Sequence, residues 1–380
     1  MSGHLPPRGH VTSPRVPHQP ARPPRPEVVA LLACGKPARA TVLRAAQAAT
    51  ARALPLDLVV VPRPGDPPAR ALVSTDRSLQ LVRRVFPHQE VRVHVDVPDP
   101  AAWLRAHTRG TRGLWVDPGL RERFGLPGTT SRPARTGRSS APGATPRLTI
   151  AVPPFRAVLF DLDGVLTGTA ALHEQAWARL AAEDLGGHRL THTEYLDLVD
   201  GRNREQGLAR LVALCGVAPD SAALTALAAR KDGYFCAALA DRGPRVLPGA
   251  RALAERLVGS GVATAVVSAS RNARRVLAAA DLLQLFDEVV DGVLAAHRKL
   301  PGKPDPALFL EAARRLGCPP DCAVVVEDSR AGLEAGRRGG FGLTLGIGDG
   351  ASVEQLCAAG ADLVVPDLEA VDVDIEEEEP

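Results

Sequence analysis

The segment Arg156–Ala170 reads RAVLFDLDGVLTGTA, and its pattern decides the fold class of the chain. An apolar run ends at Asp161 and Asp163, two positions apart, and Gly164 follows directly. In α/β proteins, ligands lie at the carboxyl ends of buried parallel strands. Two neighbouring carboxylates repel each other unless they share a proton or a cation, and Mg²⁺ prefers oxygen ligands of this kind. The segment therefore predicts a strand that ends at a magnesium site; the alternative is an ordinary Asp-Gly surface turn.

The composition is typical of a soluble globular protein. Of the 380 residues 45% are hydrophobic and 23% charged, and the length is sufficient for two domains. No apolar run reaches the length of a membrane span, and the N-terminus has no apolar signal segment. Six scattered cysteines predict reduced thiols rather than a disulfide framework. We therefore expect a cytoplasmic protein that does not contact a membrane.

The formal net charge of +3 is unevenly distributed. Several arginines precede the first acidic residue, Glu27, and the C-terminus carries the run IEEEEP. Such asymmetry is typical of solvated tails. Because the basic tail is interrupted by prolines and has no interleaved aromatic residues, nucleic acid is not an expected partner.

Composition and periodicity divide the chain into five segments. In two of them strand-like runs alternate with helical patterns, which predicts parallel βα units. Helices are expected at residues 39–54, 75–86 and 101–108 of the first. Stretches rich in Pro, Arg, Gly and Ser are typical of tails and linkers. The predicted segments are a disordered Pro/Arg-rich tail (1–26), a small α/β domain of unknown role (27–124), a linker (125–150), a larger α/β domain (151–370) and an acidic tail (371–380).

The larger domain is predicted to contain a helical insert. After the strand that precedes Asp161, residues 171–242 show helical apolar spacing and no convincing strand. Strand patterns resume at VATAVVSAS, DEVVDG, CAVVVEDS, GLTLGIG and ADLVV. The expected fold is α/β, a Rossmann-like parallel sheet with a helical cap, preceded by the smaller α/β domain. An insert at this point lies over the carboxyl end of the sheet, where it can exclude water from a metal site.

Polar residues of complementary type follow the apolar runs of this domain. Ser268 ends the second strand, Lys303 precedes a helix, and Glu327 and Asp328 end a later strand. In a parallel sheet these ends meet Asp161 at one edge. Carboxylates there can hold Mg²⁺, while a lysine and a hydroxyl face an oxyanion. A phosphoryl group fits, with Asp161 as nucleophile and Asp163 as proton donor and acceptor.

These motifs resemble those of the haloacid dehalogenase superfamily of phosphotransferases. The matching segments are FDLDGVLT, VVSAS, GKPDP and VVEDSRAGLEAGRRGG, within about residues 155–368. The helical insert is similar to the superfamily's helical cap of the first type. Within the superfamily, TGTAALHEQAW, VDGRNREQGL, RKDGYF and SASRN resemble the β-phosphoglucomutases and their hydrolase relatives.

The resemblance implies a role for each matching residue. Asp161 corresponds to the nucleophile and metal ligand, and Asp163 to the general acid/base that lends its backbone carbonyl to Mg²⁺. Glu327 and Asp328 correspond to the acidic pair of the metal site. Arg204 corresponds to the cap arginine that holds the substrate's non-transferring phosphate. The remaining phosphate- or substrate-binding positions are Ser268 and Lys303, then Ser270, Arg271 and Asn272, the hinge-proximal Thr169 and His173, and Lys231 of the cap.

Two residues depart from the family pattern. Gly168 stands where these relatives usually have an acidic residue, and Asp200 where some mutases have a basic one. Both lie outside the four motifs, so they bear on the sugar and not on phosphoryl transfer.

The expected function is Mg²⁺-dependent conversion of β-glucose 1-phosphate to glucose 6-phosphate through an aspartyl phosphate. The alternative is a phosphatase acting on a hexose phosphate or trehalose 6-phosphate. An alternative of another class is a non-catalytic binding protein with a nucleotide-binding N-terminal domain. The expected partner is a small phosphorylated sugar, and the expected assembly is a monomer or weak homo-oligomer.

Overall fold

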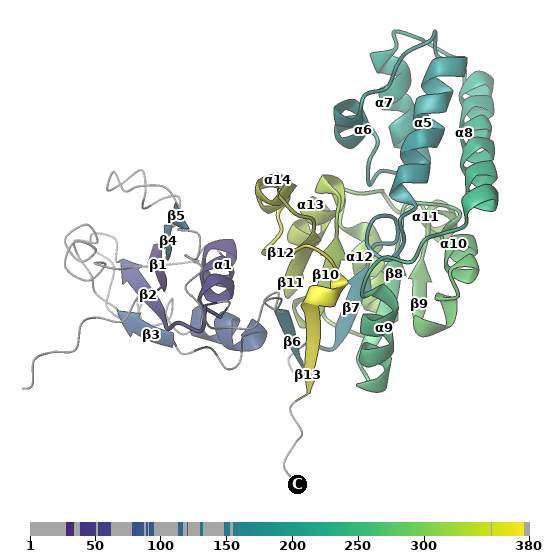
Figure 1. Cartoon of the computed structure of the whole chain (residues 1–380). Helices are drawn as coiled ribbons and strands as arrows, with labels where there is room; N and C mark the ends of the chain where they lie inside the picture. The colour runs from purple at the N-terminus through teal and green to yellow at the C-terminus, as the bar shows by residue number, and fades with distance from the viewer. Residues whose placement is uncertain are drawn as a thin grey trace, which may run out of the picture.

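The computed structural model describes residues 28–33, 39–50, 52–61, 78–86, 89, 91–94, 113–116, 120, 130–131, 148–152, 155–350 and 352–375. The tail predicted at residues 1–26 and the helix predicted at residues 101–108 lie outside these ranges. Within them, no helix combines the length and apolarity that a bilayer crossing requires. Figure 1 shows a small N-terminal sheet, a larger α/β unit and a group of helices, α5–α8, above the larger unit.

The larger unit is built on a six-stranded parallel sheet with the strand order β12-β11-β10-β7-β8-β9. The strand that precedes Asp161 is β7, and it pairs with β8 on one side and β10 on the other. Each strand predicted after the insert is present, and the predicted α/β fold is confirmed. The strands are β7 (Ala157–Phe160), β8 (Ala263–Val267), β9 (Glu288–Val290), β10 (Ala323–Glu327), β11 (Leu343–Ile347) and β12 (Leu363–Val365).

Helices cover both faces of this sheet, which explains why the strands are apolar throughout. Val158 and Phe160 of β7 lie in one core cluster with Leu253 of α9, whereas Leu159 lies in a second cluster with Phe309 of α12. Successive strand residues therefore reach opposite helical layers. The helices are α9 (Ala250–Gly259), α10 (Ala273–Ala279), α11 (Gly292–Arg298), α12 (Ala307–Arg315), α13 (Arg330–Arg338) and α14 (Ser352–Ala359).

The predicted insert is a group of helices between β7 and β8: α5 (Ala170–Asp184), α6 (His192–Leu198), α7 (Arg204–Leu214) and α8 (Ser221–Arg242). Their apolar faces form a separate core that includes Trp177 and Leu211. The side chains of Thr191, Asn203 and Asp220 cap the starts of α6, α7 and α8. The cap thus has its own packing and its own helix start signals, so it forms a compact unit above the sheet.

The N-terminal unit contains a five-stranded sheet with the order β3-β2-β1-β4-β5. The pairs among β1–β4 are parallel, and β5 is antiparallel to β4. Helix α1 also contacts the larger unit, because Arg39 forms an ion pair with Asp362 at 3.2 Å. The elements are β1 (Val28–Ala33), α1 (Arg39–Thr50), β2 (Leu56–Val61), a helix at residues 78–85, β3 (Val91–His94), β4 (Gly113–Val116) and β5 (Thr130–Ser131).

Two predicted boundaries differ from the structure. The linker predicted at residues 125–150 contains β5 and the start of β6 (Leu148–Val152), and the acidic tail predicted at residues 371–380 begins with β13 (Val371–Ile375). Strands β6 and β13 pair in parallel as a separate two-stranded sheet. In β13 the sequence VDVDI alternates apolar and acidic residues, which is typical of a half-exposed strand. Together with the glutamates that follow, these residues have the acidic composition of a tail, and for this reason the strand was not predicted.

Candidate active site

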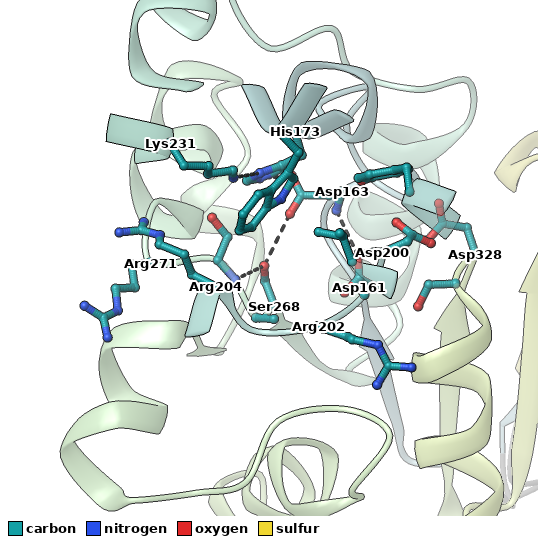
Figure 2. Close-up of a pocket in the computed structure, with 17 residues that line it drawn as sticks. Asp161, Asp163, His173, Asp200, Arg202, Arg204, Lys231, Ser268, Arg271 and Asp328 are labelled. Atoms are coloured by element: carbon teal, nitrogen blue, oxygen red, sulfur yellow. Dashed lines mark hydrogen bonds and ion pairs between the residues drawn. The ribbon is translucent and has the colours of Figure 1, made fainter. Parts of the chain in front are cut away.

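The carboxyl ends of β7, β8 and β10 meet below the cap, as the parallel sheet requires. Asp161 follows β7, Ser268 follows β8, and Glu327 ends β10 with Asp328 directly after it. Figure 2 shows Asp161, Asp163, Ser268 and Asp328 around one cavity, which His173, Arg204 and Lys231 reach from the cap. The cavity has a volume of about 60 Å³. Residues far apart in the sequence therefore line one small space.

Lys303 is completely buried next to Asp161. Its ammonium group donates to Asp161 Oδ1, to Glu327 Oε1 at 2.6 Å and to the Val267 carbonyl at 3.2 Å. These three acceptors use all three of its protons. Burial alone would lower the pKa of Lys303, but Asp161 and Glu327 outweigh it and raise that pKa above its usual range. Lys303 is therefore a fixed positive charge between two carboxylates.

On the sheet side of the cavity, the carboxyl groups outnumber the single charge of Lys303. Burial, partly opposed by Lys303, raises the pKa of Asp161 to about 8. Burial also raises the pKa of Asp163, and burial together with Asp200 and Glu327 raises the pKa of Asp328 well above its usual range. Each shift means that the ionised form is disfavoured there. A divalent cation would relieve this unfavourable charge.

The oxygen donors present fit Mg²⁺, which keeps several waters and needs only one or two protein carboxylates. Asp328 packs against the backbone at Gly164, where an added Cβ would lie 1.8 Å from Asp328 Oδ2 and where φ is +99°. This close approach brings the Asp328 carboxylate next to the peptide that follows Asp163. Among the described residues, no three His, Cys, Asp or Glu side chains form a ready metal cluster. Asp161 and Asp328, which line the cavity, could hold such an ion together with the Asp163 carbonyl.

Glu327, which the sequence predicts as part of the metal site, has both of its oxygens occupied by protein groups. Its Oε1 accepts from Lys303, and its Oε2 accepts from the Asp328 and Ser329 backbone N–H groups and from the Ser329 hydroxyl, at 2.9–3.0 Å. The side chain is fully buried. Glu327 thus orients Lys303 and the turn at Asp328, whereas Asp161 and Asp328 line the cavity.

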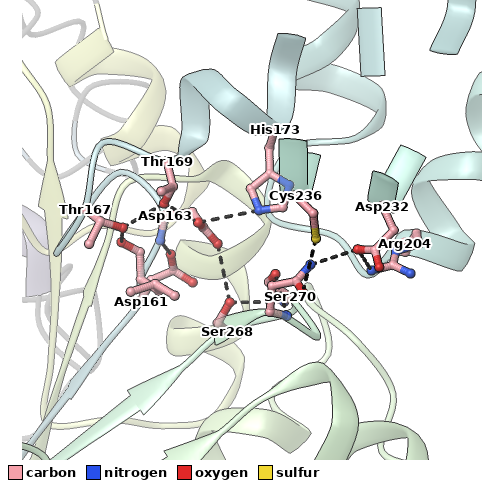
Figure 3. A network of polar contacts seen from close by, with 12 residues as sticks. Asp161, Asp163, Thr167, Thr169, His173, Arg204, Asp232, Cys236, Ser268 and Ser270 are labelled. Atoms are coloured by element: carbon pink, nitrogen blue, oxygen red, sulfur yellow. Dashed lines mark hydrogen bonds and ion pairs between the residues drawn. The ribbon is translucent and has the colours of Figure 1, made fainter. Parts of the chain in front are cut away.

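Three groups contact the side chain of Asp163 (Figure 3). Its Oδ1 accepts from the Thr169 hydroxyl and lies 3.5 Å from His173 Nε2. Its Oδ2 accepts from the Ser268 hydroxyl at 3.4 Å. His173 belongs to the first helix of the cap, so this contact connects the cap and the sheet. The carboxyl group is thereby oriented in the cavity beside Asp161.

On the cap side, the partly buried His173 contacts the buried Lys231. Lys231 Nζ lies 2.7 Å from His173 Nδ1, and the His173 ring stacks on Phe235 at 3.9 Å between centroids. Burial, with Lys231 and Arg204 nearby, lowers the pKa of His173 well below its usual range, so its ring is neutral at pH 7. Nδ1 then accepts a hydrogen bond from Lys231, and Nε2 carries the hydrogen on the side of Asp163. Burial and Arg204 also lower the pKa of Lys231 to about 7.

The lowered pKa of Lys231 leads to a prediction of how the stability of the chain changes with pH. The pKa of Lys231 is about 7 in the folded chain, against an ordinary value of 10.5. Between pH 7 and pH 10.5 the unfolded chain therefore binds more protons than the folded chain. The free energy of unfolding rises with pH over this range. Urea unfolding should show that the free energy of unfolding of the wild type increases between pH 7 and about pH 9.5 by about 2–3 kcal/mol more than that of Lys231→Met. The exposed Lys299→Met is the matched control. An equal pH response in Lys231→Met and wild type would contradict this account.

Two of the remaining predicted residues, Arg204 and Asn272, contact Asp232, which was not predicted from the sequence. Arg204 forms an ion pair with Asp232 at 2.6 Å (Figure 3). Asn272 Nδ2 donates to the same Asp232 Oδ1 at 2.8 Å. Arg271 pairs instead with Glu205 of the cap at 2.6 Å. Polar contacts therefore connect the segment after β8 to the cap. Within that segment, the Ser270 backbone N–H donates to Ser268 Oγ at 3.0 Å.

Tyr195 and Arg202 also line the cavity and were not predicted. The Tyr195 hydroxyl forms a hydrogen bond with Asp200, and burial followed by Glu327 raises the pKa of Asp200 to about 6. In the sequence Tyr195 belongs to the apolar face of a helix, and Arg202 lies in a short loop with no periodicity. Only one feature of the sequence could have identified Asp232 as a site residue, namely its position next to Lys231 in the segment RKDGYF.

Comparisons with known proteins cover this part of the chain. Residues 155–340 match the model of the haloacid dehalogenase-like hydrolases. Over 235 residues the chain is 41% identical to a β-phosphoglucomutase of Mycobacterium bovis, over 56% of this chain and 90% of that relative. It is 31% identical over 189 residues to hexitol phosphatase A of Escherichia coli, and the match covers 49% of this chain and 80% of that relative. A crystal structure of β-phosphoglucomutase from Clostridium difficile matches with a TM-score of 0.50 at 26% identity, over 56% of this chain and 92% of that one.

Proposed function

Because the chain belongs to the haloacid dehalogenase-like hydrolase family and is an enzyme of that superfamily, we propose that it transfers the phosphoryl group of a sugar phosphate through Asp161. The proposed reaction is the conversion of β-glucose 1-phosphate to glucose 6-phosphate. The observation that carries the proposal is the position of Asp161 and Asp163 at one cavity, with the buried Lys303 bonded to Asp161.

In the proposed reaction, an oxygen of Asp161 attacks the phosphorus while the bond to the leaving oxygen breaks, and that oxygen takes the proton of Asp163. In the return step a substrate hydroxyl gives its proton to Asp163, its oxygen attacks the phosphorus, and the bond to Asp161 breaks. Burial raises the pKa of Asp163, which favours the protonated form needed first. Asp161, Asp328 and the Asp163 carbonyl would hold a Mg²⁺ ion, which would neutralise negative charge on the phosphoryl group.

Cap movement is part of the proposed cycle. A cavity of about 150 Å³ holds one benzene molecule. The cavity here measures about 60 Å³, and a sugar phosphate is larger than benzene. The substrate therefore enters when the cap moves away from the sheet. Closure then returns His173 to Asp163, so the proton donor is held in place when water is excluded.

The distinction between mutase and phosphatase depends on what reaches the phosphorylated Asp161. A mutase returns the phosphoryl group to a second sugar hydroxyl, and we propose Arg204 as the cap residue that holds the other phosphate of the bisphosphate. One observation favours the phosphatase alternative: Asp232 already neutralises Arg204 at 2.6 Å, so binding a phosphate there requires that ion pair to open. The similarity to hexitol phosphatase A supports the same alternative.

An assay with two readouts tests this proposal. With Mg²⁺, β-glucose 1-phosphate and catalytic glucose 1,6-bisphosphate, we expect glucose 6-phosphate to form faster than phosphate is released. Arg204→Ala should lower the rate of glucose 6-phosphate formation by about 10- to 100-fold, since a hydrogen bond to a charged group contributes about 1.5–3 kcal/mol. The exposed Arg210→Ala, on the same helix, is the control.

The outcomes separate the candidates. Dominant phosphate release by wild type would overturn the mutase and support the phosphatase. Absence of both products, together with no phosphorylation of Asp161 by acetyl phosphate, would overturn phosphoryl transfer itself.

A further inference from the structure

Helix α1 of the N-terminal unit lies between two sheets. It packs against β1, β2 and β4 of its own unit and also against β12 of the larger unit (Figure 1). Its buried positions cover more of the helix circumference than the single stripe that is typical of a surface helix. These positions are Thr41, Val42, Leu43, Ala45, Ala46 and Ala49. The helix therefore has a second packed face.

The second face is a stripe of residues four positions apart, Arg39, Leu43 and Gln47, which lie above one another on a helix. Leu43 is fully buried and belongs to the same apolar cluster as Leu363 of β12. Gln47 Nε2 lies 3.5 Å from the Val364 carbonyl oxygen of the same strand. The stripe thus follows β12.

At the start of the stripe, Arg39 neutralises a carboxylate of the larger unit. Asp362 directly precedes β12 and is 9% exposed, and its Oδ2 accepts from the Thr344 backbone N–H at 2.9 Å and pairs with Arg39 Nη2 at 3.2 Å. Arg39 also donates to the Phe341 carbonyl at 3.0 Å and to the Gly342 carbonyl. Burial raises the pKa of Asp362, and Arg39 partly opposes this rise. A buried charge of the larger unit is therefore compensated by a cation of the other unit.

Strand β12 is an edge of the six-stranded sheet. Among the described residues it pairs with β11 alone, so its outer side offers backbone groups that no strand of this sheet uses. Exposed edges of this kind can pair with another chain, and a helix packed over the edge prevents it. The position of α1 against β12 fits this role.

The apolar cores of the two sheets are continuous. One cluster includes Val28 and Leu32 of β1, Leu43 of α1, and Leu363 and Val365 of β12. The cap, in contrast, has a core of its own. Because a domain that folds alone has its own core, a shared core indicates that the two sheets depend on each other.

We propose that the N-terminal unit is a permanent intramolecular partner of the six-stranded sheet: Arg39, Leu43 and Gln47 of α1 cover the β12 edge and join the two sheets into one cooperatively unfolding unit. This inference gives the N-terminal unit a role that goes beyond the proposed phosphoryl transfer. It does not depend on that proposal, because no substrate takes part in it.

Hydrogen exchange of the full chain in increasing low concentrations of urea, read by mass spectrometry, tests joint unfolding. In wild type, peptides from β1 and β7 should lose their protection at the same urea concentration. Val59→Ala, in the buried strand β2 and outside the shared cluster, should lower the protection of β7 as much as that of β1. Separate transitions of β1 and β7 in wild type would overturn the inference, and this comparison needs no variant to fold.

Arg39→Met tests the stripe itself. The substitution removes the charged donors and leaves Asp362 buried without its partner, so exchange of β12 should accelerate about 10- to 100-fold. Adding Asp362→Asn should recover part of the protection, because a neutral side chain needs no cation. Arg83→Met, at an exposed arginine of the helix at residues 78–85, is the matched control and should leave β12 unchanged. Unchanged exchange of β12 in Arg39→Met would show that α1 does not hold this edge.

Discussion

Asp161→Asn is expected to lower the rate of phosphoryl transfer by at least about 10³-fold, because an amide cannot form the aspartyl phosphate. Assays of product formation, and incubation with labelled acetyl phosphate, measure the loss directly. The variant should remain folded, because Lys303 keeps Glu327 and the Val267 carbonyl as hydrogen-bond acceptors. A cooperative thermal unfolding transition close to that of wild type would confirm this.

The exposed Asp241→Asn provides the control, because the Asp241 side chain is 81% exposed on α8 and lies outside the cavity. We expect it to retain wild-type rates. Retention of label by Asp161→Asn would mean that another residue accepts the phosphoryl group, and the assignment of the nucleophile would then be wrong.

Lys303→Met is expected to lower both activity and stability. The substitution leaves Asp161 and Glu327 buried without their common cation, and breaking a buried pair typically lowers stability by about 3–5 kcal/mol. Urea unfolding in the presence of a chelator measures this effect without a metal that could replace the ammonium group. Because protonation removes the unpaired negative charges, the difference from wild type should shrink as the pH is lowered.

A second substitution tests the cause. Adding Glu327→Gln to Lys303→Met should recover part of the stability, with a coupling energy of at least about 1 kcal/mol. The reason is that Glu327 accepts from Lys303 at 2.6 Å, so its buried charge is harmful only when the lysine is absent. Lys299→Met, at an exposed lysine, controls for the loss of a positive charge. Strict additivity of Lys303→Met and Glu327→Gln would contradict a buried network between the two residues.

Local patterns were sufficient to predict most elements of the larger unit. The run before Asp161 is β7, the later apolar runs are β8–β12, and the helical spacing of residues 171–242 corresponds to α5–α8. The prediction was wrong where the amino-acid composition and the spacing of apolar residues indicate different structures. Residues Val371–Ile375 have the period of a strand, but the acidic run after them suggests a tail, and their partner strand β6 lies far away in the sequence. A short strand of this kind is stable only when its partner is present.

The motifs also indicated which residues meet, because the carboxyl ends of parallel strands share one edge whatever the side chains are. Asp161, Ser268 and Asp328 could be grouped on that ground alone. The hydrogen-bond partner of each side chain could not be predicted from the sequence. Hydrogen bonds depend on small differences in atomic position, and these are set only when the cap and the sheet pack together. That packing decides that Lys303 and the Ser329 turn saturate Glu327 and that Asp232 neutralises Arg204. It also leaves the buried Arg202 Nε atom without a hydrogen-bond partner among the described residues.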